Sequence, residues 1–149
     1  MEVNLINLQK RIQLTPFILL NTKKAVRETL SFEAAKLTGH ANICLVDDQK
    51  ITRFNKKYFG TASATDVIAF EISGNSRPLK LQAEIIISTE AAYRNAKIYK
   101  TSPDYELFLY VIHGMLHTLG YEDNTEKKRK IMRDKAMKIL TKLNLNANP

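Results

Sequence analysis

The stretch VIHGMLHTLGYED, residues 111–123, holds two histidines four positions apart, a glycine and an acidic pair. It closes a longer segment that opens with Ser102 and Pro103, a pair typical of a helix N-cap and the first helical position. Apolar residues fill most of this segment, so we expect a helix over 102–120 that is buried almost all round. Gly120 suits its left-handed stop, and the histidines are then expected inside the protein.

His113 and His117 occupy positions i and i+4, so on a helix they share one face, with Cβ atoms roughly 5–6 Å apart. Each needs a polar partner that the surrounding leucines cannot supply, and histidine is the commonest metal ligand. The pair therefore favours a metal site, although one buried histidine alone is more simply a hydrogen-bonded core residue. Catalytic zinc usually has three protein ligands and an open position, so a third donor is expected nearby.

Glu122 and Asp123 are the local candidates for this third donor, because the chain must turn after the helix and can fold back over its end. Asp123 has a competing role, since together with Glu126 it fits a capping box for the last helix. His40, the only other histidine, is expected in an exposed loop. A zinc protease carries glutamate directly after the first histidine, and here that position is Gly114, which leaves space beside a metal for a substrate.

The composition of the whole chain fits one globular domain over residues 1–149. Hydrophobic residues make up 44% and charged residues 26%, which excludes intrinsic disorder, and a single cysteine, Cys44, excludes an intrachain disulfide. The start lacks a signal peptide, and no segment has the roughly 20 apolar residues of a membrane span, so we expect a cytoplasmic protein. The net charge of +8 favours nucleic acid as a partner, although solvated lysines explain it equally well.

The pattern along the chain predicts an α+β or mixed-sheet fold. Four segments have the alternating or β-branched composition of strands, the last two as a hairpin: 3–7, 41–46, 65–72 and 81–88. Besides 102–120, helices are expected at 15–37, capped by Thr15 and stopped by Gly39; at 49–59; at 89–99, capped by Thr89; and at 124–143. The last of these helices is amphipathic and strongly basic.

Three blocks of the sequence resemble the YbeY family of bacterial metal-dependent endoribonucleases. HGMLHTLGYED, 113–123, resembles the family signature H-G-x-L-H-x-x-G-Y-D-H. FNKKYFGTASATDVIAFE, 54–71, resembles its asparagine-tyrosine-arginine segment followed by T-D-V-x-x-F, and AEIIIS, 83–88, resembles its G-D-I-x-I-S strand. Two positions depart from the family: Asp123 stands where it has a third histidine, and Phe59 stands where it has arginine.

The resemblance implies a single zincin-like α+β domain, with a mixed sheet of about four strands packed with about five helices. It implies a single-strand-specific endoribonuclease that matures ribosomal RNA of the small subunit, at the 3' end of 16S rRNA, and acts in ribosome quality control. It implies one divalent metal ion, with zinc first and manganese, magnesium or ferrous iron also compatible with Asp123. The alternative is a noncatalytic ribosome-assembly factor with a structural or vestigial metal site.

Site residues follow from this resemblance and from the basic surface. The expected metal ligands are His113, His117 and Asp123. The expected catalytic residues are His113 and His117 with Asp66, which would orient a ligand at the start of a strand. Five basic residues are expected to contact the RNA: Arg53, Lys57, Lys128, Arg129 and Lys135.

Overall fold

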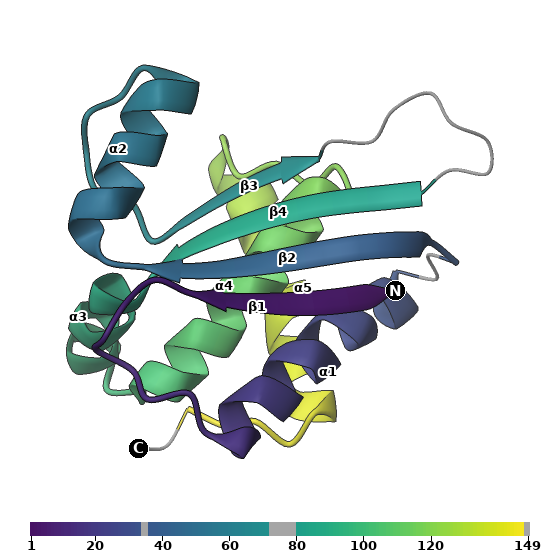
Figure 1. Ribbon diagram of the computed structural model, residues 1–149. Coiled ribbons are helices and arrows are strands. Elements are labelled where there is room, and N and C mark those ends of the chain that lie inside the picture. The colour runs from purple at the N-terminus through teal and green to yellow at the C-terminus, as the bar shows by residue number, and fades with distance from the viewer. Residues whose placement is uncertain (34–35, 72–79, 148–149) are drawn as a thin grey trace.

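Alternating apolar residues build a four-stranded mixed sheet in the computed structural model, which describes residues 1–33, 36–71 and 80–147 (Figure 1). The strand order is β1-β2-β4-β3. β1 (Glu2–Asn7), β2 (Thr38–Val46) and β4 (Lys80–Ser88) run parallel, and β3 (Val67–Glu71) pairs antiparallel with β4 at the edge. The predicted antiparallel pairing of the last two strands is confirmed, and its connection lies outside the described residues.

The helices divide unequally between the two faces of the sheet (Figure 1). Four helices lie on one side of the sheet and share its main core: α1 (Pro16–Phe32), α3 (Thr89–Tyr99), α4 (Pro103–Thr118) and α5 (Glu126–Lys142). The other face carries only α2 (Asp48–Phe59), over a small cluster of Val46, Ile51, Ile68 and Ile86. Four strands and five helices within the described residues confirm the predicted α+β class.

Gly39 has a different role from the predicted helix stop. Helix α1 begins at Pro16 behind its Thr15 cap, as expected, but it ends at Phe32 rather than near residue 37. Gly39 lies within β2 at φ +130°, where a Cβ atom would stand 2.0 Å from the carbonyl oxygen of Leu81. The glycine therefore allows close approach of β2 and β4, which a short-range pattern does not reveal.

Two predicted caps are also wrong by one or two residues. Ser88, not Thr89, caps α3, because its hydroxyl accepts from the backbone N–H of Ala91 at 3.1 Å. Thr125, not Asp123, caps α5, with its hydroxyl 3.2 Å from the backbone nitrogen of Lys128. The capping-box role of Asp123 is therefore excluded, and its carboxylate is available for other contacts.

Helix α4 packs closely on the sheet through Gly114. A Cβ atom at this position would stand 2.6 Å from Cγ2 of Ile85 in β4, so the glycine serves helix–sheet packing. The predicted space beside a metal at this position is wrong, because the Ile85 side chain occupies it. Gly120 follows the helix at φ +98°, which confirms the left-handed stop.

The start of α2 is tied to α3 by hydrogen bonds around Asp48. Its backbone N–H donates to Oε1 of Glu90 at 3.1 Å, and its carboxylate accepts from the hydroxyl of Ser88 at 2.7 Å. Arg94 of α3 forms an ion pair with the same carboxylate. These contacts fix α2 over its corner of the sheet. Within the described residues, no helix combines the length and the apolar character that a membrane crossing needs.

Candidate metal centre

The last two turns of α4 present His113 and His117, and the following loop brings Asp123 back to them. Backbone hydrogen bonds from Gly120 to the His117 carbonyl and from Tyr121 to the Leu116 carbonyl, both 3.0 Å, close the helix end. Oδ2 of Asp123 then lies 3.3 Å from Nε2 of His117. The His117 side chain is 29% exposed and His113 is partly accessible, so the histidines lie inside the protein only in part.

The hydrogen bonds of His117 determine where its proton lies. Nδ1 is 2.9 Å from the carbonyl oxygen of Tyr121, and a carbonyl only accepts, which assigns the proton to Nδ1. In the neutral ring, Nε2 therefore carries a lone pair that faces the Asp123 carboxylate. Two electron-rich atoms at this separation need a proton or a metal cation between them.

The spacing of this pair suits a shared metal ligand set. Nitrogen and oxygen ligands at about 2.0–2.2 Å from a tetrahedral zinc ion stand roughly 3.3–3.4 Å apart. The 3.3 Å between Nε2 of His117 and Oδ2 of Asp123 matches this separation. The backbone contact at Nδ1 also resembles the outer hydrogen bond that fixes the orientation of metal-binding histidines.

His113 has an unsatisfied ring nitrogen one turn earlier on α4. Its Nε2 is buried and has no hydrogen-bond partner, which typically costs about 1–3 kcal/mol. Burial lowers the pKa of His113 below the ordinary histidine value, and the nearby Asp66 carboxylate opposes this shift. A neutral ring with a free lone pair is the form that binds metal.

Asp66 precedes β3 and is fixed by the backbone. Its Oδ1 accepts from the N–H of Val67 at 2.8 Å, and its own carbonyl accepts from Ser88 at 2.9 Å. Asp66 lies near His113, whose Nε2 has no hydrogen-bond partner. Across 1–33, 36–71 and 80–147, no three His, Cys, Asp or Glu side chains are close enough to hold one metal ion. The structure brings together the pair of His117 and Asp123, with His113 outside it.

Two of the expected RNA contacts on α5 brace the loop that carries Asp123. Lys128 pairs with the carboxylate of Glu122, and Nη1 of Arg129 donates to the carbonyl oxygen of Asp123 at 3.1 Å. These cations therefore lie beside the histidine pair while they hold the loop in place.

Lys135, farther along the same helix, contacts Glu33 and Tyr121. Its Nζ is 3.0 Å from Oε1 of Glu33 and 5.0 Å from the centre of the Tyr121 ring. The Tyr121 hydroxyl donates to the same carboxylate at 2.6 Å. This network holds Tyr121, whose carbonyl orients His117. Sequence reasoning missed that role, because a backbone carbonyl leaves no residue-type signal.

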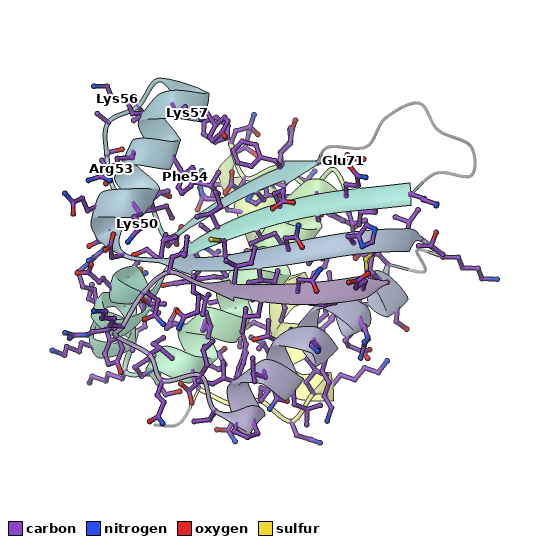
Figure 2. All side chains as sticks on the ribbon, viewed as in Figure 1. Lys50, Arg53, Phe54, Lys56, Lys57 and Glu71 are labelled. Atoms are coloured by element: carbon purple, nitrogen blue, oxygen red, sulfur yellow. The ribbon has the colours of Figure 1, made fainter. Side chains whose placement is uncertain are left out.

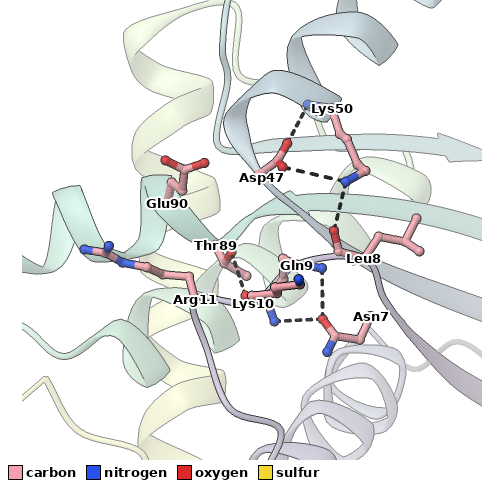
Figure 3. A pocket seen from close by; sticks show the side chains of 9 residues that line it. All are labelled: Asn7, Leu8, Gln9, Lys10, Arg11, Asp47, Lys50, Thr89 and Glu90. Carbon is pink, nitrogen blue, oxygen red and sulfur yellow. Dashed lines mark hydrogen bonds and ion pairs between the residues drawn. The ribbon is translucent and has the colours of Figure 1, made fainter.

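The other two expected RNA contacts, Arg53 and Lys57, are exposed on α2, which lies on the opposite face of the sheet. The five basic residues therefore occupy two separate surfaces. A separate hollow of about 580 Å³ opens at the carboxyl ends of β1, β2 and β4 (Figure 3). It contains no histidine, and its Lys50 is held by Asp47 at 3.7 Å and by the Leu8 carbonyl at 3.3 Å.

Comparison with known proteins assigns the chain to a family. The family model for endoribonuclease YbeY matches residues 4–144. Endoribonuclease YbeY of Desulforamulus reducens is 34% identical over 98% of this chain and 99% of its own length. That of Alkaliphilus oremlandii is 32% identical over 97% and 99%. The chain belongs to the endoribonuclease YbeY family, which confirms the resemblance of its three sequence blocks.

A solved structure has the same fold. The solution structure of TM1509 from Thermotoga maritima superposes with a TM-score of 0.60, at 23% identity, over 95% of this chain and 91% of that one. This likeness supports the α+β architecture described above.

Proposed function

We propose that this chain is a metal-dependent endoribonuclease that cleaves single-stranded RNA, with a divalent metal ion held by His113, His117 and Asp123. The observation that carries the proposal is the 3.3 Å between Nε2 of His117 and a carboxylate oxygen of Asp123, with Nδ1 of the same ring bound to the Tyr121 carbonyl. Nε2 of His113, which is buried without a hydrogen-bond partner, would supply the third donor. The relatives are named endoribonucleases, and family membership supports the same activity here.

Zinc is the proposed metal, because two imidazoles and one carboxylate form a common catalytic zinc set. The carboxylate is a harder ligand than a third imidazole, so manganese, magnesium and ferrous iron are also suited to this site. When bound, the metal supplies a Lewis acid that polarises a phosphate oxygen or lowers the pKa of water.

The residues of the chain hold and orient the reacting groups. The Tyr121 carbonyl accepts a hydrogen bond from Nδ1–H of His117, which leaves Nε2 as the ring nitrogen directed at Asp123. Asp66, fixed by the backbone of Val67, lies near His113, and its carboxylate would orient a ligand held there. Lys128 and Arg129 border the Asp123 loop, where they can contact phosphates on either side of the cleaved bond.

The proposed substrate is ribosomal RNA of the small subunit, cleaved at the 3' end of 16S rRNA during maturation and quality control in the cytoplasm. Family membership and the net charge of +8 support this substrate class. All five basic residues, namely Arg53, Lys57, Lys128, Arg129 and Lys135, remain proposed RNA contacts.

The alternative is a noncatalytic RNA-binding assembly factor. One observation favours it: within the described residues the third donor, His113, does not converge with the other two. A protein of this class would bind RNA through its basic surfaces and leave the strand intact.

Cleavage assays distinguish the two functions. A single-stranded RNA and the same sequence in a duplex are incubated with the protein, with and without chelator, and with zinc or manganese added back. We expect cleavage of the single strand, its loss with chelator and its recovery with metal, and no recovery for His117→Ala. Cleavage that persists in chelator contradicts the metal role, and binding without cleavage under every condition supports the assembly factor.

A further inference from the structure

Four aromatic side chains gather where α2 meets the edge strand β3. Phe54, Tyr58 and Phe59 come from the helix, and Phe70 comes from the strand. The rings of Phe59 and Phe70 stack with centroids 5.5 Å apart and planes 5° apart. Tyr58 meets Phe70 edge-on at 4.9 Å and stacks with Phe54 at 6.2 Å. The four rings therefore form one continuous aromatic surface.

The inner and outer rings of this surface differ in exposure. Phe54 and Phe70 are partly buried against the small cluster under α2, which anchors them. Tyr58 is 50% exposed and Phe59 is 56% exposed. Large aromatic rings contribute most when they bury their area, so two neighbouring rings held open to solvent indicate a binding surface.

Positive charge lies on the same helix as the two exposed rings, and one lysine lies over a ring. Arg53, Lys56 and Lys57 are exposed on the same helix, and Figure 2 shows them along α2 beside Phe54. Lys57 Nζ lies 5.2 Å from the centre of the Tyr58 ring. Within the described part of the chain, none of these three cations has a carboxylate oxygen within 4.0 Å. Their charges are therefore available to a ligand.

We propose that Tyr58 and Phe59, backed by Phe70, form a platform on which unpaired RNA bases stack, while Arg53, Lys56 and Lys57 bind the adjoining phosphates. Flat apolar rings interleaved with cations complement a single strand, whose bases have free faces, and a duplex hides those faces. This inference rests on the proposed function and specifies how the single strand is held. At position 59, the arginine of the family signature is replaced by a stacking ring.

The location of this platform fits that role. Strand β3 is the edge of the sheet, with α2 on one of its faces and α4 on the other. Asp66 directly precedes this strand, and its carboxylate lies near His113. In this proposal the RNA strand crosses the β3 edge between the platform and the histidines.

Binding to fluorescently labelled single-stranded RNA tests the platform, measured in chelator so that neither cleavage nor metal contributes. The variants Tyr58→Leu and Phe59→Leu remove a ring and keep apolar bulk. Tyr99→Leu, at a 67% exposed tyrosine on α3, is the matched control. We expect each platform variant to weaken binding roughly tenfold, in line with stacking on a single ring, and the control to bind like the wild type.

Two further measurements separate stacking from other effects. RNA with abasic positions has no bases that could stack there, so it should bind all three leucine variants with equal affinity. Phe59→Leu should leave the slope of log affinity against log salt unchanged, whereas Lys57→Gln should lower it by about 0.7. Melting curves of each variant check the fold.

Several outcomes overturn the inference. Platform variants that bind like the wild type exclude it, as does an equal loss on abasic RNA. Loss of self-association or of protein binding, with RNA affinity unchanged, would assign the surface to a protein partner instead. If the protein cleaves RNA but the leucine variants bind it like the wild type, only the platform is overturned. If binding depends on the two rings but no RNA is cleaved, only the proposed endoribonuclease activity is overturned.

Discussion

Both ring nitrogens of His117 face oxygen acceptors, the Tyr121 carbonyl at 2.9 Å and the Asp123 carboxylate at 3.3 Å. One proton on the neutral ring satisfies only the first of them. Asp123 is also free of helix capping, since Thr125 takes that role. The chemistry of the site therefore depends on whether a proton or a metal ion lies between His117 and Asp123.

Substitution of Asp123 separates a metal ligand from a structural residue. Asp123→Ala should weaken zinc and manganese binding strongly and change the melting temperature little. Asp123→His should raise zinc affinity, because imidazole replaces a harder carboxylate. Thr125→Ala is the matched control: it should cost about 1 kcal/mol of stability through the lost cap and leave metal affinity unchanged. Equal metal affinity in all four proteins would remove Asp123 from the ligand set.

The sequence nominated His113 and His117 through helix periodicity, which puts i and i+4 on one face, and Asp123 through its place after the helix end and in the family signature. It could not choose between the ligand and capping roles of Asp123. That choice depends on whether Thr125 or Asp123 has the extended backbone and reach of a cap, which the loop after Gly120 sets.

At the scale of elements, α4 carries the histidines and is held against β4 by a close contact at Gly114. Gly114→Ala would place a Cβ atom 2.6 Å from Cγ2 of Ile85, so overpacking of about 1–3 kcal/mol should exceed the helix-propensity gain of about 1 kcal/mol. Urea unfolding should show a net loss of stability. In the double variant with Ile85→Ala, the loss of stability should be smaller than the sum of the two single losses. Strictly additive losses would contradict a contact between the two positions.

Glu106 gives α4 a pH-dependent contribution to stability. Its side chain is buried, and burial raises the pKa of this carboxyl above the ordinary glutamate value. Its stabilising protonated form is present below the unfolded pKa of about 4.3 and is lost as pH rises through the folded pKa. Glu106→Gln keeps the acceptor for the Thr101 hydroxyl at 2.5 Å and removes the charge.

Urea unfolding of wild type and Glu106→Gln at several pH values tests this account. The two proteins should have similar stability near pH 4, and the glutamine variant should be the more stable by about pH 7, because only the wild type must ionise a buried group. A constant difference across this range would contradict a raised pKa.

Most helices and strands were predictable, because caps such as Thr15 and Ser102 and stops such as Gly120 act within one turn. Gly39 was misassigned for the opposite reason. It resembles a helix stop locally, but its position is set by the carbonyl of Leu81, some forty residues away, at 2.0 Å from a would-be Cβ. Likewise, the order β1-β2-β4-β3 depends on long-range pairing.

At the scale of the whole molecule, the net charge of +8 should make RNA binding depend steeply on salt. Replacing Lys128 and Arg129 with glutamine should lower the slope of log affinity against log salt by about 1.4 if both contact phosphates of a single strand. The same replacement of Lys23 and Lys24, exposed on α1, is charge-matched and should have a smaller effect. Equal changes in both variants would mean that the α5 cations attract RNA only through net charge.

The metal content of the purified protein shows whether His113, His117 and Asp123 hold a metal ion. Elemental analysis should find about one zinc or other divalent ion per wild-type chain, as in a three-ligand site. His40 lies near the start of β2 and pairs with Glu2, so His40→Ala should retain that metal content. His117→Ala should fall to near zero with its fold intact. Equal metal content in His117→Ala and wild type, or none in any of the three proteins after metal exposure, would contradict the account.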